Sequence, residues 1–437
     1  MRFALYTTSI SAHQLPLARE IVKRVGAENF RYIYTGVLQG GGQEVECKEP
    51  WIEKSGGALA DDWLVGCDFL LCGVRDIDLI ELRAKKGLKT AYMSERWFKP
   101  VEIKVEKRGG ISPDRRESRS ERYAGCGQWC FHLPGRLRML VPGYWRMAKR
   151  VVRWLKSDPN AHYLAIGPWA KKDMLWLGVP EEKIVDWGYV VATGMRTEPP
   201  PQGPSANTPY PFARSSAPHP LRSIIRVLWV GRMLGWKRVD TIVRAVGEVE
   251  RRGGDEVEKI GGISPDRRKS RSERYAWCGQ RISLTLVGDG PEKERLLRLT
   301  EKLGVRCKKE RSNPLSTSTS FLHLLPPQPI EKIREIMREH DVYVLASNAQ
   351  EGWGATVNEA LEEGMMVLGT YEAGASAALL PPEHLFHAGD WKTLAKMLYN
   401  ITINGGRCCF DEVFADYSPA GAVEKLMTIW KICKRGK

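Results

Sequence analysis

The sequence predicts an α/β protein of two doubly wound domains, each a parallel sheet with helices on both faces. Three observations lead to this prediction. Patterns typical of buried strands alternate with helical patterns along both halves of the chain, an order that favours parallel sheets. A proline-rich stretch, 199–220, continues neither element type and indicates a connection between domains. The chain has 437 residues, which is enough for two sizeable cores.

The first domain is expected at 1–198, from the spacing of its apolar residues. Its predicted strands are Arg2–Thr7, Arg31–Gly36, Cys67–Gly73, Lys89–Ser94, Ala161–Gly167 and Lys183–Tyr189. Helical patterns fall between several of these strands, notably at Leu15–Val25 and Trp169–Leu177.

The second domain is expected at 221–415. Its predicted strands are Arg226–Gly231, Ile282–Gly288, Phe321–Leu325, Asp341–Ser347 and Met365–Thr370, alternating with helices that begin near Val239, Pro291, Ile330 and Thr356. A last helical segment, 416–437, is expected to be able to cross back to the first domain. Because ligands of such sheets bind at the carboxyl ends of the strands, we expect the site in a cleft between the domains.

The composition is that of a folded globular protein, with 43% hydrophobic and 27% charged residues. Residues Met1–Ala12 lack the apolar core and cleavage site of a signal peptide, and no apolar run is as long as a membrane span. The ten cysteines lack the paired spacing of zinc ligands. We therefore expect reduced thiols, no bound metal and a cytoplasmic location.

The net charge of +15 favours a polyanionic partner or surface. Much of this charge lies at 129–156, where Arg and Lys residues are interleaved with aromatic and aliphatic residues. The segment suits the headgroups of an anionic membrane, which would make the protein peripheral at the inner face. It equally suits an ordinary amphipathic helix whose apolar face is core, and both interpretations stay open.

Residues 105–128 and 257–280 are two copies of one unit that differ only at Arg108/Ile260, Glu117/Lys269 and Gly125/Trp277. Two separated copies do not make a solenoid. The unit is rich in Ser, Arg and Gly and has almost no apolar periodicity, so we expect inserted, exposed loops, the second after a helix at Val239–Arg252. A nucleic-acid clamp is disfavoured because aromatic residues are sparse in both copies, and no nucleic-acid partner is expected.

Two carboxylates, Glu351 and Glu359, flank a glycine-broken turn between a predicted strand and a predicted helix. The N–H groups of such a turn and the positive end of the helix dipole favour an anion, usually a phosphate. A carboxylate does not bind phosphate, so Glu351 and Glu359 are expected to accept hydrogen bonds from hydroxyl groups attached to it, as sugars carry.

A cationic pair, Arg232 and Lys237, follows the predicted strand Arg226–Gly231. Such a pair suits a diphosphate, because a guanidinium bridges two oxygens while an ammonium acts as a compact charge. The next strand ends in Gly288-Asp289-Gly290-Pro291, a dinucleotide fingerprint without its third glycine, which supports NAD binding only weakly.

Taken in order, these residues resemble a family 4 glycosyltransferase of the GT-B fold, one of the glycosyl transferases group 1. The resemblance rests on Gly231-Arg232-Met233 with Lys237, on Val287–Pro291, and on the paired Glu351 and Glu359. It covers residues 221–400 well, and the first half more loosely through Ile166–Met174, Leu177–Pro180 and Lys183–Val185.

The resemblance implies transfer of a sugar, of the hexosyltransferase type, from a nucleotide-diphosphate sugar to a glycan or lipid-linked acceptor. Arg232 and Lys237 would hold the donor diphosphate, Glu351 the donor sugar and Glu359 the ribose. The remaining donor contacts would come from Gly231, from the backbone N–H groups of Gly352, Trp353, Gly354 and Ala355, and, at the nucleobase, from Leu325 and Pro326. Configuration would be retained without a metal or other cofactor, because the leaving diphosphate takes the acceptor's proton.

His13 and Glu95, each just past a predicted strand end that faces the cleft, are the candidates for acceptor contact. The sequence departs from the family pattern in three places. Trp353 replaces a smaller apolar residue and would narrow the sugar pocket, and Thr8–Gln14 replaces a glycine-rich turn. Tyr189 follows Gly188 where Asn-Gly is usual, so no role is assigned to it.

Two other classes remain as alternatives. A sugar-nucleotide epimerase of the same fold would need acid and base side chains at the sugar, and the order of cationic and acidic residues favours the transferase. A non-enzymatic basic protein would bind nucleic acid or membrane through the repeats and 129–156. Deleting both repeats would separate these classes, since a transferase should keep its activity.

Overall fold

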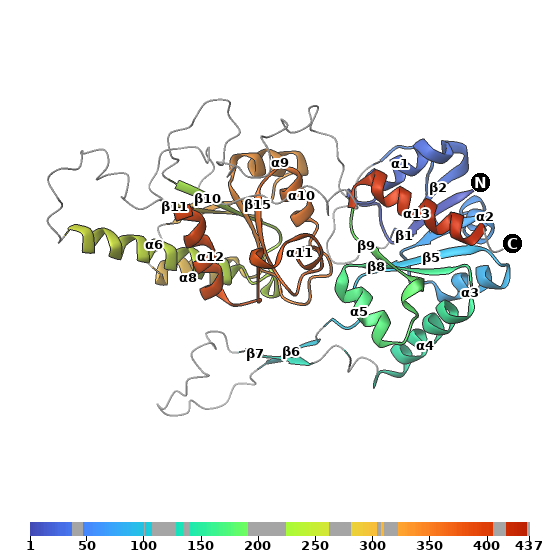
Figure 1. Ribbon diagram of the computed structural model, residues 1–437, viewed down its shortest axis with the longest axis horizontal. Coiled ribbons are helices and arrows are strands. Elements are labelled where there is room, and N and C mark those ends of the chain that lie inside the picture. Colours follow the sequence, from blue (N-terminus) through green and yellow to red (C-terminus); the bar gives the residue numbers. More distant parts are fainter. Residues whose placement is uncertain are drawn as a thin grey trace.

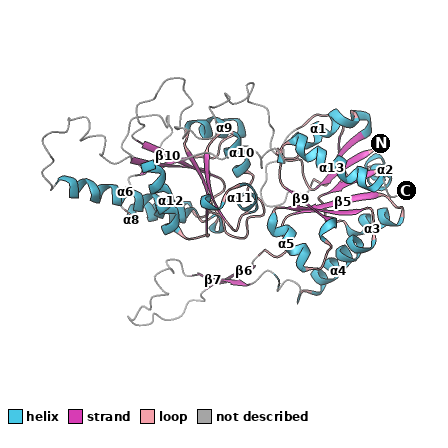
Figure 2. Cartoon of the chain, viewed as in Figure 1, coloured by secondary structure: helices cyan, strands magenta, loops and turns pink. Residues whose placement is uncertain are grey.

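The computed structural model describes residues 1–36, 47–99, 101–106, 128–133, 136, 140–190, 224–261, 281–303, 307–309, 322–404 and 417–434. These residues form two domains, and each is a parallel sheet with helices on both faces (Figure 1). The layered arrangement of strands between helices is plain in Figure 2. The predicted fold class, two doubly wound α/β domains, is confirmed.

The first sheet has the strand order β3-β2-β1-β4-β5-β8-β9, and every described pairing in it is parallel. The interior strand β1 is buried at each position because helices cover both faces of the sheet. The strands are β1 (Phe3–Thr7), β2 (Phe30–Tyr34), β3 (Ile52–Lys54), β4 (Phe69–Cys72), β5 (Lys89–Ser94), β8 (Ala161–Ile166) and β9 (Ile184–Trp187).

The helices of the first domain begin and end at residues suited to those positions. Helix α1 has a proline in its first turn and ends at Gly26, whose φ is 87°, and the side chain of Asp76 caps α3 by accepting from Leu79 N at 3.0 Å. The elements are α1 (Leu15–Val25), α2 (Ala58–Gly66), α3 (Ile77–Lys85), α4 (Pro142–Ser157), α5 (Pro168–Trp176) and the 3-10 helices η1 (Ala27–Asn29) and η4 (Glu181–Lys183).

The second sheet is also parallel and has seven strands, but its order, β12-β13-β11-β10-β14-β15-β16, differs because β13 lies between β11 and β12. Its strands are β10 (Ile224–Val230), β11 (Arg281–Val287), β12 (Cys307–Lys309), β13 (Leu322–Leu325), β14 (Val342–Leu345), β15 (Met366–Thr370) and β16 (Leu385–Phe386). Its helices are α6 (Val239–Gly261), α8 (Lys293–Lys302), α9 (Ile330–Glu339), α10 (Thr356–Glu362), α11 (Gly374–Leu379) and α12 (Trp391–Asn404), with 3-10 helices η5 (Gly235–Lys237) and η6 (Pro382–His384).

The last helix, α13 (Pro419–Lys434), packs on the first domain beside α1 (Figure 1). The Trp430 ring lies 6.1 Å from the Phe69 ring, and the Trp430 carbonyl accepts a hydrogen bond from Lys89 Nζ at 3.3 Å. An exposed ion pair joins Arg24 to Glu424 at 2.5 Å. Ring packing contributes more here than the exposed pair, because water screens exposed charges.

Several elements differ from the sequence prediction. The edge strands β3, β12 and β16 were not predicted, because two or three residues carry no readable alternation. An antiparallel pair outside both sheets, β6 (Val101–Glu106) with β7 (Gln128–Leu133), was also missed. The linker 199–220 and most of both repeats, 107–127 and 262–280, lie outside the described residues.

The expectation that the repeats are loops throughout was wrong at their ends. Helix α6 continues to Gly261, through the first residues of the second copy, and β6 and β7 include the ends of the first copy. Adding a residue to an existing helix is easier than starting one, and three of the residues after Gly254, namely Glu256, Glu258 and Lys259, are good helix formers.

The basic segment 129–156 is mostly α4 in its described part, and one face of that helix is core. Ala148, Val151, Trp154 and Leu155 are buried there, which supports the amphipathic-helix interpretation for this face. The opposite face is exposed and basic. Within the described ranges, no helix combines the length and apolar character needed to cross a membrane.

Candidate active site

The carboxyl ends of β10, β11 and β13 converge because backbone hydrogen bonds join their loops. Gly231 N donates to the Val287 carbonyl, and Gly288 N donates to the Leu325 carbonyl, each at 3.0 Å. Gly288 has a φ of 141°, and a Cβ added to it would lie 1.9 Å from the Gly231 carbonyl oxygen. Only glycine lets these loops meet. Two predicted donor regions, Gly231 and Leu325–Pro326, are thereby brought together, with Leu325 half-buried and Pro326 exposed.

Arg232 and Lys237 follow the same strand but have different surroundings. Arg232 is exposed, and among the residues that the structure describes its guanidinium has no ion-pair partner. Lys237 ends η5, and its ammonium lies 4.4 Å from the centroid of the Trp236 ring. The same ammonium pairs with the Glu351 carboxylate, so the structure joins two of the predicted site residues.

Glu351 lies in the loop after β14, where it is 8% exposed. The Ser347 hydroxyl donates to the same Glu351 oxygen that Lys237 binds, at 2.8 Å. Asn348 N donates to the Trp236 carbonyl at 2.8 Å, which fixes this loop against the loop of Lys237. A buried carboxylate requires such partners, because an unpaired buried charge is costly.

The turn from Gly352 to Ala355 leads directly into α10. Gly354 has a φ of 94°, and a Cβ added to it would lie 2.7 Å from the Leu345 side chain, so the turn needs glycine here. Within the described part of the chain, the backbone N–H groups of the turn donate to no protein acceptor. Free N–H groups at the start of a helix are suited to bind an anion.

Glu359 lies on α10 and is 4% exposed. Burial raises the pKa of its carboxyl to about 7, although the nearby Arg334 acts in the opposite direction. His13 Nδ1 lies 3.9 Å from Glu359 Oε1, and burial, aided by Arg334, lowers the pKa of the His13 imidazole to about 4. Glu359, predicted to contact ribose, and His13, predicted to contact the acceptor, therefore lie side by side. The His13 imidazole is neutral near pH 7.

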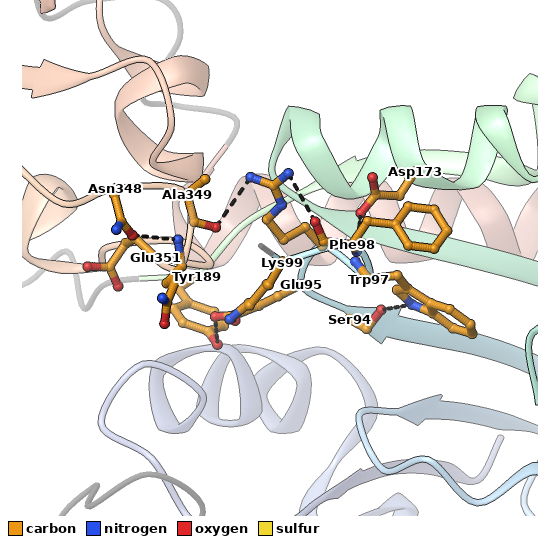
Figure 3. A network of polar contacts seen from close by, with 12 residues as sticks. Ser94, Glu95, Trp97, Phe98, Lys99, Asp173, Tyr189, Asn348, Ala349 and Glu351 are labelled. Carbon is orange, nitrogen blue, oxygen red and sulfur yellow. Dashed lines mark hydrogen bonds and ion pairs between the residues drawn. The ribbon is translucent and has the colours of Figure 1, made fainter. Parts of the chain in front are cut away.

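Glu95, the other predicted acceptor residue, follows β5 and faces the glycine turn of the second domain. The Tyr189 hydroxyl donates to its Oε1 at 2.9 Å, and Lys99 Nζ pairs with its Oε2 at 2.7 Å. A Cβ added to Gly352 would lie 1.8 Å from Glu95 Oε2, so the carboxylate rests against the turn. Figure 3 shows Glu95, Lys99 and Tyr189 of the first domain beside Glu351 of the second.

Trp353 is fully buried between the domains. Its indole N–H donates to Asn358 Oδ1 at 2.8 Å, and its ring centroid lies 5.5 Å from that of Tyr417. A Cβ on Gly188 would lie 2.5 Å from the indole. The side chain expected to narrow a sugar pocket thus packs the domain interface, and its backbone N–H is the group left to meet a donor.

Four residues in this region were not predicted: Ser347, Tyr189, Lys99 and Arg96. Arg96 Nη1 donates across the interface to the Ala349 carbonyl at 3.3 Å. Ser347, Tyr189 and Arg96 share one sequence signal, because each lies two residues past the end of an apolar strand, and a similar position identified Glu95. Lys99 lies further along the loop after β5 and lacks this signal. The described residues hold no group of three or more His, Cys, Asp or Glu side chains that could bind a metal ion.

Two doubly wound domains packed against each other form the architecture of the GT-B class of proteins. Residues 225–403 match the family model described as glycosyl transferases group 1. The match covers most of the second domain, and the resemblance drawn from the sequence is confirmed. A search of the curated proteins found no match.

Solved structures share the architecture over the whole chain. The apo form of the lipopolysaccharide outer core galactosyltransferase WaaB is 12% identical over 98% of this chain and 99% of that one, with a TM-score of 0.55. A glycosyltransferase from Rickettsia africae ESF-5 is 13% identical over 100% and 99%, with a TM-score of 0.54. Anabaena HepE in complex with UDP is 12% identical over 100% and 99%, with a TM-score of 0.52. At such identities the likeness shows the fold alone, which is GT-B.

Proposed function

We propose that this chain is a hexosyltransferase that moves a sugar from a nucleotide-diphosphate sugar to a hydroxyl of a glycan or lipid-linked acceptor, with retention of configuration. The structural neighbours support the substrate class, since HepE binds UDP. Another neighbour, a trehalose-6-phosphate synthase with a TM-score of 0.50, is described as an enzyme of glycosyl transfer with retention.

The ion pair between Lys237 and Glu351 is the observation that carries the proposal. Glu351 neutralises Lys237 at a strand end beside a turn whose N–H groups donate to no acceptor among the described residues. A donor diphosphate would draw the Lys237 ammonium to its own oxygens, with the exposed Arg232 as a second cation. Glu351 would then accept hydrogen bonds from hydroxyls of the donor sugar. Both cations would stabilise the charge that grows on the diphosphate as it leaves.

The carboxyl group of Glu359 suits a ribose. Its raised pKa of about 7 gives it a large protonated fraction near neutral pH. A protonated carboxyl donates one hydrogen bond and accepts others, as a ribose with two hydroxyl groups requires. His13, neutral at this pH and 3.9 Å away, would complete this part of the donor site.

In the chemical step, the bond between the sugar's anomeric carbon and the diphosphate oxygen breaks. The acceptor hydroxyl oxygen bonds to the same carbon on the same face, and its proton passes to an oxygen of the leaving diphosphate. The step needs no enzymic nucleophile. We also propose that it uses no metal ion or other cofactor, since Lys237, Arg232 and the turn N–H groups supply positive charge at the diphosphate.

The first domain would supply the acceptor side of the site. Glu95 lies against Gly352, where a sugar contacting the turn would sit, so donor binding requires this carboxylate to withdraw from the turn. Its partners Tyr189 and Lys99 leave it able to accept hydrogen bonds from an acceptor hydroxyl. We place this reaction in the cytoplasm, where nucleotide sugars are made.

A thermal-shift panel of nucleotide sugars tests the proposal, using the parent protein, Glu351→Ala, and the control Glu301→Ala on an exposed position of α8. A true donor at about 100 times its Kd should raise the Tm of the parent and the control by about 5 °C and leave Glu351→Ala nearly unshifted. The same donor is then incubated with the enzyme. Release of nucleoside diphosphate supports a transferase, an epimerised donor indicates the epimerase, and equal shifts in all three proteins contradict the assigned site.

A further inference from the structure

Helix α4 has an outward face with strong positive charge. The face exposes Arg146, Lys149, Arg153 and Lys156, and the helix, Pro142–Ser157, contains no acidic residue. In Figure 1, α4 lies along the lower edge of the first domain. Its other face is buried in the core, so this charge is displayed on a rigid element.

The charge on this face is not neutralised by the protein. Arg150, on the flank of α4, pairs with Asp78 at 2.5 Å and with Glu81 at 2.8 Å. By contrast, none of Arg146, Lys149, Arg153 and Lys156 pairs with a carboxylate among the described residues. Exposed cations are commonly balanced elsewhere in this chain, as Lys332 is by Glu335 on α9. The outward face of α4 is therefore suited to an external anion.

Exposed apolar side chains gather beside these cations. Five of the eleven large apolar side chains exposed in the described residues lie here: Leu140 (77%), Val141 (56%), Trp145 (42%), Leu175 (39%) and Trp176 (47%). Between α4 and the end of α5 is a cavity of about 500 Å³, lined mainly by Trp145, Lys149, Val152, Arg153, Lys156 and Leu177. The cations and apolar groups thus form one surface, here named the α4 patch.

We infer that the α4 patch docks the protein on an anionic lipid bilayer. Trp and Leu side chains enter the boundary between headgroups and acyl chains, while Lys and Arg remain with the phosphates. Lys149 Nζ lies 4.7 Å from the centroid of the exposed Trp145 ring, which is the arrangement of a cation held at such a boundary. A hydrophilic anion such as nucleic acid would gain nothing from burying Leu140 and Val141, so the bilayer is the occupant that uses both halves of the patch.

The α4 patch is connected to the proposed site through packed side chains. The Trp176 ring packs edge-on against Phe98, with centroids 5.1 Å apart. The Phe98 carbonyl accepts from Arg96 at 3.4 Å, and Arg96 also donates to the Ala349 carbonyl of the second domain. A bilayer on this patch would hold a lipid-linked acceptor close to Glu95. This inference rests on the proposed function for its acceptor, but the docking is measured without one.

Sedimentation of the full chain with vesicles tests the inference. The vesicles are phosphatidylcholine alone, or phosphatidylcholine mixed with phosphatidylglycerol. The variant is Lys149→Glu/Arg153→Glu/Lys156→Glu. The control is Arg298→Glu/Lys302→Glu/Lys396→Glu, which makes the same charge change at exposed positions of the second domain. The patch variant should lose about 100-fold in partition onto the mixed vesicles, and the control should change only a few-fold.

A second variant, Trp145→Ser, separates apolar insertion from simple charge attraction, and it should weaken binding to mixed vesicles about tenfold. Equal binding of the parent to both kinds of vesicle would overturn the inference, as would equal losses in the patch variant and its control. The donor thermal shift is measured on the patch variant as well. A retained donor shift with lost vesicle binding supports the α4 patch, whereas a donor shift missing from every protein contradicts the proposed function alone.

Discussion

Each domain brings a lysine–glutamate pair to the interface, but the two pairs differ in burial. In the second domain, the side chains of Lys237 and Glu351 are 19% and 10% exposed. In the first domain, those of Lys99 and Glu95 are 30% and 29% exposed. Removing one partner of a buried pair leaves an uncompensated charge, whereas water screens the charges of a partly exposed pair. The second domain therefore holds fixed charges and the first holds adjustable ones.

The two pairs also differ in how the chain makes them. Lys99 and Glu95 are four residues apart on one loop, so a local turn is enough to join them. Lys237 and Glu351 are 114 residues apart and come from the ends of two neighbouring strands, β10 and β14. Only the assembled sheet brings them together. This contrast suits a donor site that is rigid and an acceptor site that adapts.

The largest expected effect is the loss of the Lys237 ammonium. Lys237→Ala should lower kcat/KM for the donor by about 10²–10³-fold, because a cation aimed at the leaving diphosphate is lost. Lys99→Ala should cost less than about tenfold, since its pair is partly exposed. The measurement is the rate of nucleoside diphosphate release with the donor found by thermal shift.

Lys237→Arg is the matched control for charge. It keeps a cation but changes its shape, so its activity should fall between those of the parent and Lys237→Ala. Equal losses in Lys237→Ala and Lys99→Ala would show that the two sides of the interface do not differ in the way proposed here.

An intermediate effect is expected at Glu359, whose buried carboxyl is stabilised in its protonated form. Its folded pKa of about 7 lies above the ordinary 4.5, so the folded protein holds a proton that the unfolded chain releases. Stability from this group is therefore present below pH 4.5 and is lost as the pH rises to about 7. Glu359→Gln removes this loss and should stabilise the protein above pH 7 by about 3 kcal/mol, with little effect near pH 4.5.

Urea unfolding near pH 4.5 and above pH 7 measures the difference in the free energy of unfolding between Glu359→Gln and the parent. The exposed control Glu301→Gln should change the free energy of unfolding by less than about 0.5 kcal/mol at either pH. Because the glutamine amide donates and accepts hydrogen bonds as the protonated carboxyl does, donor affinity should change little if that protonated form contacts ribose. A stability gain that is the same at both pH values would contradict the role of ionisation.

The sequence was sufficient for the longer, inner strands of both sheets and for the proximity of Lys237 and Glu351. Apolar runs such as Val342–Leu345 are buried on both faces, so their pattern is unambiguous, and polar residues directly after them lie at the same edge. That logic placed Lys237 and Glu351 near each other. It also identified Glu95, because Glu95 is a polar residue directly after the buried strand β5.

The contacts between the domains were beyond the sequence. Nothing local indicates that Gly352 must lack a side chain because Glu95 comes from the other domain to rest against it. From its place in the sequence, Trp353 was expected to line the sugar pocket. In the structure it fills a space next to Gly188 and Tyr417, which come from distant segments of the chain. The helix–strand alternation fixes each sheet but does not fix how two sheets meet.

The smallest expected effect is at Tyr189, which connects the two halves of the comparison. Burial, and to a lesser degree Glu95, raises the pKa of its hydroxyl well above the ordinary value, so it stays a hydrogen-bond donor to Glu95. Tyr189→Phe removes one hydrogen bond to a charged group and should raise the acceptor KM about five- to tenfold while donor affinity stays unchanged.

The matched control is Tyr163→Phe, which removes a buried hydroxyl bonded to Ser94 at 2.8 Å in the same domain without touching Glu95. It should lower the Tm but leave the acceptor KM alone. If Tyr189→Phe weakened donor binding as much as acceptor binding, Glu95 would belong to the fixed donor side, and the division between the two domains would fail.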